Sequence, residues 1–185
     1  MAEKYGFFNA VNQGGVYDRT YMAEDFAEAM RSFITTGVFD TDNNDLQIQP
    51  PDVQGMNVKV GAGRAWINGY WYVMDADRTF DVDVSDGVQT RIDAVVVRWA
   101  ASERTITMEY VKGTPSASSP AKPQPQRTSA YYELFLGYIT VGPSTANIQS
   151  SDIEDTRNSS TLCGMITNAN LISPIDNETI DSIIV

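Results

Sequence analysis

The stretch that decides the fold is Ile92-Asp93-Ala94-Val95-Val96-Val97-Arg98-Trp99. Its central residues are apolar on both faces, so a strand formed here has to be covered on each side, which predicts a central position in a sheet. The next run, Thr105 to Lys112, alternates apolar and polar residues and follows after a short turn. These two runs are therefore expected to pair as a hairpin.

Strand patterns continue on both sides of this hairpin. Before it, residues 56–60 and 80–84 alternate with period two, and Asn68-Gly69 sits inside an aromatic run, which is typical of a tight hairpin turn. After it, the Pro-rich segment Thr114 to Thr128 predicts a loop or extended arm, and Tyr131 to Val141 predicts a further strand. In that strand we expect Leu134, Leu136 and Tyr138 on one side and Phe135, Ile139 and Val141 on the other. The pattern predicts a mainly β fold, as a β-sandwich or open barrel.

One amphipathic helix is expected between Thr20 and Gly37. Apolar residues recur there at the spacing of a single helix face, with acidic residues in the first turn. Thr20 is the expected N-cap and Gly37 the expected stop. The apolar face consists of Met22, Phe26, Met30, Phe33 and Ile34.

The chain divides into two predicted parts. Residues 1–142 form a helix plus β-sandwich attachment domain, and residues 143–185 form a C-terminal extension that acts as an interaction arm. The extension is polar at first and ends in separated aliphatic residues outside the core pattern, which favours contact with a partner or packing on the chain's own domain. The expected contact residues are Leu171, Ile172, Ile175, Ile180, Ile183 and Ile184.

Composition narrows the chemistry. The 185 residues carry a formal net charge of −11, which disfavours nucleic acid and anionic membranes as partners. With no histidine and a single cysteine, Cys163, the chain lacks histidine-based nucleophile systems, histidine-ligated zinc and an internal disulfide. The N-terminus lacks the order of a secretory signal, which predicts synthesis in a cytoplasm. We expect no enzyme activity, no cofactor and no metal.

Three patterns suggest chemistry and are weighed against structural readings. Asp40-x-Asp42-x-Asn44 starts like a calcium loop but lacks the later glycine and glutamate, so a solvated turn is favoured. Asp75 and Asp77 are a carboxylate pair beside Trp71, although their spacing does not place them on opposite sides of a glycosidic bond. The aromatic residues Trp66, Trp71 and Tyr72 are candidates for stacking on a sugar, with a core or subunit-contact role favoured.

An ordered series of segments resembles tail proteins of phages and phage-derived particles of Gram-positive bacteria. The series runs from Tyr5-Gly6-Phe7-Phe8-Asn9-Ala10-Val11 through Ala23-Glu24-Asp25-Phe26 and Thr36-Gly37-Val38-Phe39 to Val60-Gly61-Ala62-Gly63-Arg64-Ala65-Trp66-Ile67-Asn68-Gly69-Tyr70. It continues with Arg91-Ile92-Asp93-Ala94-Val95-Val96-Val97-Arg98-Trp99, Val111-Lys112-Gly113-Thr114-Pro115, Ile153-Glu154-Asp155-Thr156-Arg157 and Leu162-Cys163-Gly164. The glycine, aromatic and ion-pair residues in these segments are typical of fold determinants.

The resemblance implies a baseplate or receptor-binding-protein N-terminal module, located in the virion at the tail tip. Such a module docks on the tail, carries more distal parts and is commonly a homotrimer. The implied function is a structural subunit that oligomerises and anchors or links receptor-binding components to the tail, with other tail or baseplate proteins as partners. The alternative is a carbohydrate-binding module that contacts host cell-wall polysaccharide.

Overall fold

The structure is a computed structural model that describes residues 5–41 and 44–167. It is mainly β with one α-helix, as the sequence predicts. The helix α1 spans Ala23–Arg31, and η1 (Ser150–Asp152) is a short 3-10 helix. The strands are β1 Asn12–Gln13, β2 Val16–Tyr17, β3 Gly37–Phe39, β4 Ile48–Gln49, β5 Asn57–Val60, β6 Gly63–Ile67, β7 Tyr70–Met74, β8 Arg78–Asp81, β9 Arg91–Ala100, β10 Thr105–Val111, β11 Tyr131–Val141, β12 Ile153–Asp155 and β13 Met165–Ile166.

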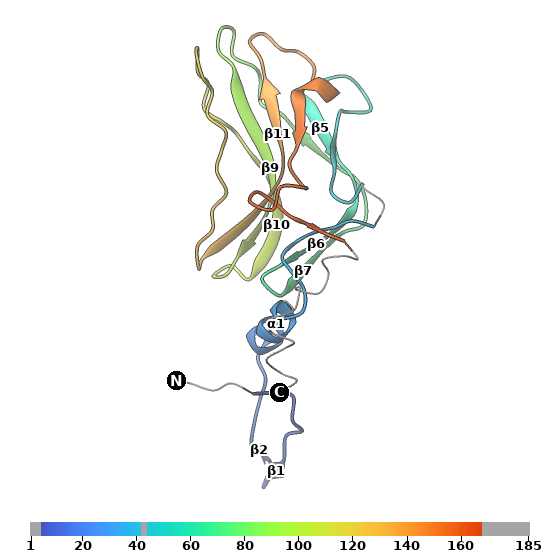
Figure 1. Ribbon diagram of the computed structural model, residues 1–185, viewed down its shortest axis with the longest axis vertical. Coiled ribbons are helices and arrows are strands. Elements are labelled where there is room, and N and C mark those ends of the chain that lie inside the picture. The colour runs from blue at the N-terminus through green and yellow to red at the C-terminus, as the bar shows by residue number, and fades with distance from the viewer. Residues whose placement is uncertain (1–4, 42–43, 168–185) are drawn as a thin grey trace, which may run out of the picture.

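Three sheets form the β domain, which comprises residues 37–167 (Figure 1). One sheet has the order β10-β9-β11-β12, a second has β13-β3-β6-β7 and a third has β4-β5-β8. The predicted central strand is β9, which pairs with β10 in a hairpin on one side and with β11 on the other. The predicted Asn68-Gly69 turn connects β6 and β7, and both of its residues have positive φ, which is the geometry of a type I′ hairpin turn.

The main core lies between the sheets. Its buried side chains come from all three of them, including Val38, Val58 and Leu134. A second, smaller cluster on the opposite face of β9 and β11 contains Val96 and Tyr138. The Pro-rich segment between β10 and β11 lies at this second face, where the Tyr138 hydroxyl donates to the carbonyl of Pro123 at 3.0 Å. Both faces of β9 are therefore covered, and the Pro-rich segment packs on its own domain.

A bulge in β11 corrects the predicted alternation of its side chains. The register against β9 shifts between Phe135 and Gly137, which inserts one extra residue at Leu136. Beyond this point the two faces exchange. Leu136 stays in the main core and is joined there by Ile139, whereas Tyr138 joins Phe135 in the second cluster.

Buried ion pairs hold the ends of the strands. Arg91 and Asp93 are almost fully buried, and the guanidinium Nε lies 3.0 Å from the carboxylate. Arg91 also donates to the carbonyl of Val84 at 2.8 Å, while Asp93 accepts from the Tyr110 hydroxyl at 2.5 Å and from the Gly113 N–H at 2.8 Å. The pair thereby joins the start of β9 to the loop before it and to the end of β10.

Residues 143–167 belong to the β domain, which moves the start of any C-terminal arm beyond the predicted boundary at 142. Strand β12 pairs with β11, and β13 pairs in parallel with β3. Arg157 is buried, donates to Asp155 at 2.7 Å and reaches the carbonyl of Asp45 at 2.8 Å. Polar residues here supply backbone pairing and a buried ion pair, so their polarity does not mark an extension.

The helix is shorter than predicted at both ends. Met22 occupies the N-cap position in place of Thr20, because the Asp25 carboxylate turns back to accept the Met22 N–H at 2.8 Å. At the other end the C-cap is Ser32, and Gly37 is the first residue of β3. Gly37 faces Gly164 so closely that a Cβ would lie 2.7 Å from its carbonyl oxygen, so the glycine is needed for strand packing and does not terminate the helix.

Candidate interaction surface

The N-terminal module comprises residues 5–33 and lies at one end of the molecule, beyond the sheets (Figure 1). It contains the β1–β2 hairpin and α1. Its attachment to the β domain is narrow, because Ala27 is the buried residue of α1. Ala27 packs on the β6–β7 turn so tightly that a Cβ on Gly69 would lie 2.1 Å from the Ala27 carbonyl oxygen.

The apolar face of α1 points to solvent. Phe26 and Met30 on α1, and Phe33 just after its end, are all exposed, although an amphipathic helix in a folded protein usually packs its apolar face on a core. The residues before the helix add further exposed aromatic side chains. We define the aromatic surface by the six most exposed of them and of the helix: Tyr5, Phe7, Phe8, Tyr17, Phe26 and Phe33.

Contacts between rings organise much of this surface. Phe7 stacks on Phe26 with centroids 5.1 Å apart, and Tyr21 touches both rings. The Tyr21 hydroxyl also accepts the Phe8 N–H at 2.9 Å, and Phe8 meets Tyr5 edge-on. Phe7 has φ of 67°, a left-handed conformation that costs a non-glycine residue energy. The module therefore holds its aromatic residues in a defined arrangement while leaving them exposed.

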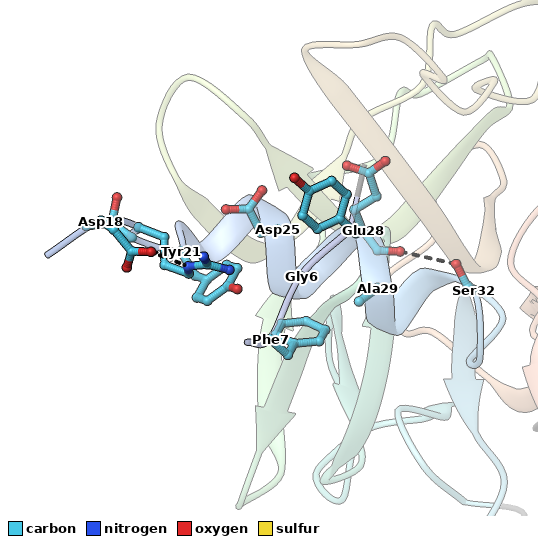
Figure 2. Close-up of a pocket in the computed structure, with 11 residues that line it drawn as sticks. Gly6, Phe7, Asp18, Tyr21, Asp25, Glu28, Ala29 and Ser32 are labelled. Atoms are coloured by element: carbon cyan, nitrogen blue, oxygen red, sulfur yellow. Dashed lines mark hydrogen bonds and ion pairs between the residues drawn. The ribbon is translucent and has the colours of Figure 1, made fainter. Parts of the chain in front are cut away.

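A pocket of about 670 Å³ opens between the N-terminal segment at Tyr5 to Phe7 and α1 (Figure 2). Figure 2 shows Asp18 and Tyr21 at one end, Asp25 and Glu28 along the helix, and Phe7 beside them. Its size is in the range of pockets that take a small molecule or a side chain of another protein. The lining residues are Tyr5, Gly6, Phe7, Asp18, Arg19, Thr20, Tyr21, Asp25, Glu28, Ala29 and Ser32.

Two carboxylates in this pocket are occupied by structural bonds. Asp18 accepts the Val11 N–H at 2.7 Å and pairs with Arg19 at 2.9 Å, which closes the β1–β2 hairpin. The hydrogen bond from Arg19 and that from the Val11 N–H lower the pKa of Asp18, so it is ionised at neutral pH and holds no proton to donate. Asp25 is committed to the N-cap of α1. These groups position the module and are not arranged as an acid–base pair.

The described residues hold no group of three or more acidic or cysteine side chains placed to bind a metal ion. The Cys163 side chain is buried, and burial raises the pKa of its thiol to about 12. A thiol that stays protonated at neutral pH is a poor nucleophile. Cys163 packs in the main core, as expected for a small buried residue.

The three candidate sugar-stacking residues fall on two faces. Trp66 and Trp71 are cross-strand partners in the β6–β7 hairpin and share its outer face, where Trp71 is 71% exposed. The Trp66 indole N–H is buried and has no hydrogen-bond partner among the described residues. Tyr72 packs against the main core on the other face. The structure brings the two tryptophans together and separates Tyr72 from them.

The acidic patterns form turns and connections. Asp77 accepts the Ala62 N–H at 3.0 Å and lies 3.7 Å from the Lys59 ammonium group, which ties the β7–β8 connection to β5 and to the β5–β6 connection. Asp75 lines a second, smaller pocket of about 350 Å³ together with Asp45. Asp45 itself is buried and accepts the Thr41 N–H at 3.0 Å, and Asp42 of the Asp40-x-Asp42-x-Asn44 stretch lies outside the described residues.

The predicted partner contacts Leu171, Ile172, Ile175, Ile180, Ile183 and Ile184 lie outside the described residues. Sequence reasoning did not select the aromatic surface as a contact site. The signal was present in the sequence, because Tyr5, Phe7 and Phe8 lie close together in the N-terminal segment that precedes a helix with an aromatic face. The helical pattern shows which residues share a face but does not show whether the chain itself covers that face.

Comparisons with known proteins give no match among protein-family models, curated proteins or solved structures. Within the described ranges, the structure contains no helix long and apolar enough to cross a membrane.

Proposed function

We propose that this chain is a non-enzymatic structural subunit of a phage or phage-derived tail tip, which oligomerises and links receptor-binding components to the tail. The observation that carries the proposal is the aromatic surface, held in place on a module that projects from an otherwise closed β domain. Exposed apolar surfaces of this extent on a soluble protein mark sites of protein–protein contact. The sequence resemblance to Gram-positive phage tail proteins supplies the kind of assembly.

The segments that carry that resemblance have structural roles that agree with a scaffold. Arg91 and Asp93 form the buried pair at the start of β9, and Asp155 with Arg157 forms the pair that anchors the chain near β4. Thr156, between them, donates to the carbonyl of Phe135 at 2.7 Å. These bonds fix the β domain, which supports its role as a rigid carrier for the N-terminal module.

Electron microscopy with a labelled antibody tests this role. Particles released from the bacterium that encodes the chain are incubated with antibody raised against the β domain, and antibody depleted on the purified chain is the control. The proposal predicts label at the tail end of intact particles. Particles that contain all other tail proteins but carry no label, and no copy of this chain by mass spectrometry, would rule it out.

A second candidate function is binding of host cell-wall polysaccharide through Trp66 and Trp71. The favouring observation is their shared outer face, on which the Trp71 ring is exposed. A flat aromatic face stacks on a sugar ring. Sedimentation with purified cell walls would show binding that Trp71→Ala abolishes and Val88→Ala, an equally exposed change elsewhere, leaves intact.

A further inference from the structure

We propose that the aromatic surface of the N-terminal module is covered by a second copy of this chain. This inference deepens the proposed function and rests on it, because it assigns the contact by which a tail subunit self-associates. It differs from the C-terminal contact predicted from sequence, since the residues that carry it lie between Tyr5 and Phe33. Two observations support a second copy as the occupant.

The first observation is the solvent-exposed area of the aromatic surface. The six residues of the aromatic surface are between 47% and 81% exposed. With about 200 Å² for a fully exposed aromatic residue, they present roughly 700 Å² to solvent. A stable protein–protein interface takes about 800 Å² from each partner, and the nearby Met22, Met30 and Val16 are exposed as well. An interface that covers all six residues would therefore take from each copy about the share that stable self-association requires.

The second observation is the position of the module. It projects from one end of the β domain and touches that domain mainly through Ala27 and the Gly69 turn (Figure 1). Its outward faces are therefore accessible to another molecule of similar size. Of the large apolar side chains that are exposed among the described residues, ten lie in the module and five, including Trp71 and Val88, lie in the β domain.

The charge of the chain predicts how this contact responds to salt. Each copy carries a formal net charge of −11, so association brings like charges together. Screening weakens that repulsion and leaves the apolar contact intact. We expect self-association to tighten when sodium chloride is raised from about 0.05 to about 0.5 M. A contact made mainly by opposite charges would weaken over the same range.

Light scattering and sedimentation of the full chain test the proposal. The module variant combines Tyr17→Ser with Phe33→Ser, and its control combines Trp71→Ser with Val88→Ser, which removes exposed apolar groups from the β domain instead. All four positions are exposed, so the variants are expected to fold, which unfolding midpoints check. Buried interface aromatics each contribute a factor of about 30, so the module variant should dissociate at least about 100-fold more readily.

The expected result is a wild-type mass that is a multiple of the 20.4 kDa chain, retained by the control and reduced to one chain in the module variant. A wild type that stays at the mass of one chain, or a module variant that still assembles, would overturn the inference. If a chain ending at Thr167 dissociates while the module variant does not, the C-terminal segment makes the contact, and the proposed tail role survives. If the module contact holds but particles carry no label, the tail role fails and the inference stands.

Discussion

The β domain and the N-terminal module treat their polar and apolar groups in opposite ways. In the β domain, charged residues such as Arg91 and Arg157 are buried with partners, and the apolar side chains of three sheets share one core. In the module, charged residues form a local hairpin and helix cap while Phe7, Phe26 and Phe33 remain exposed. The β domain therefore buries its apolar side chains within a single chain, whereas the module leaves its aromatic side chains available for contact with another molecule.

The largest expected effect is a loss of stability when the buried pair of the β domain is broken. Arg91→Met leaves the Asp93 carboxylate buried without its partner, and such a change costs about 3–5 kcal/mol. Chemical denaturation measures the free energy of unfolding. Lys112→Met is the control, because it breaks a solvent-exposed pair with Asp83 and should change stability little. Equal losses in both variants would contradict the distinction between a buried and a surface pair.

The next effect lies at the junction of the two regions. Gly69→Ala adds a methyl group at a site with φ of 87° that already touches the Ala27 carbonyl, so α1 has to move away from the β6–β7 turn. Crowding of this kind costs about 1–3 kcal/mol. Amide hydrogen exchange should quicken in α1 more than in β11. Gly87→Ala, which meets no atom within 4 Å, should leave both unchanged.

A smaller effect is expected at alkaline pH. Burial, and then the hydrogen bond to Asp93, raise the pKa of Tyr110 above its usual value near 10. The folded protein therefore keeps this proton where the unfolded chain has lost it, so its stabilising contribution is complete below about pH 10 and is lost as pH rises further. Denaturation at pH 9, 10 and 11 should show falling stability. Tyr110→Phe should fall less steeply, and an identical slope would argue against this assignment.

The smallest expected effect comes from the module. Phe33→Ala removes a side chain that is largely exposed, so the free energy of unfolding should change by about 0.5 kcal/mol or less. Leu134→Ala, which removes a smaller side chain from the main core, should cost about 2–5 kcal/mol. A large loss from Phe33→Ala in the dissociated protein would show that the module depends on this ring for its own fold.

Much of the β domain follows from local sequence. The two apolar faces of the Val95 region predict a central strand, and Asn68-Gly69 predicts the β6–β7 hairpin, because strand period and turn chemistry are local properties. The exchange of faces in β11 was not predictable, since the bulge at Leu136 depends on pairing with a strand far away in the chain. The role of Arg157 was only partly visible, because its partner carbonyl at Asp45 is brought near by the fold.

The candidate site was less predictable than the fold. The helical spacing of Phe26, Met30 and Phe33 shows that they share a face, but the same spacing occurs in helices packed on a core. The decisive fact is that α1 meets the β domain through Ala27, its buried residue, while Phe26, Met30 and Phe33 stay exposed. That contact is made by the Gly69 turn, which follows α1 only after strands β3 to β6, so local sequence around the helix does not reveal it.

The measurement that tests the central claim most directly is amide hydrogen exchange of the full chain at low and high protein concentration, read by mass spectrometry. The account predicts that peptides covering residues 5–33 gain protection as concentration rises, while peptides from β9 and β11 stay unchanged. Protection that appears in the β domain instead, or no change anywhere while the mass in solution rises, would contradict the claim that the N-terminal module makes the contact.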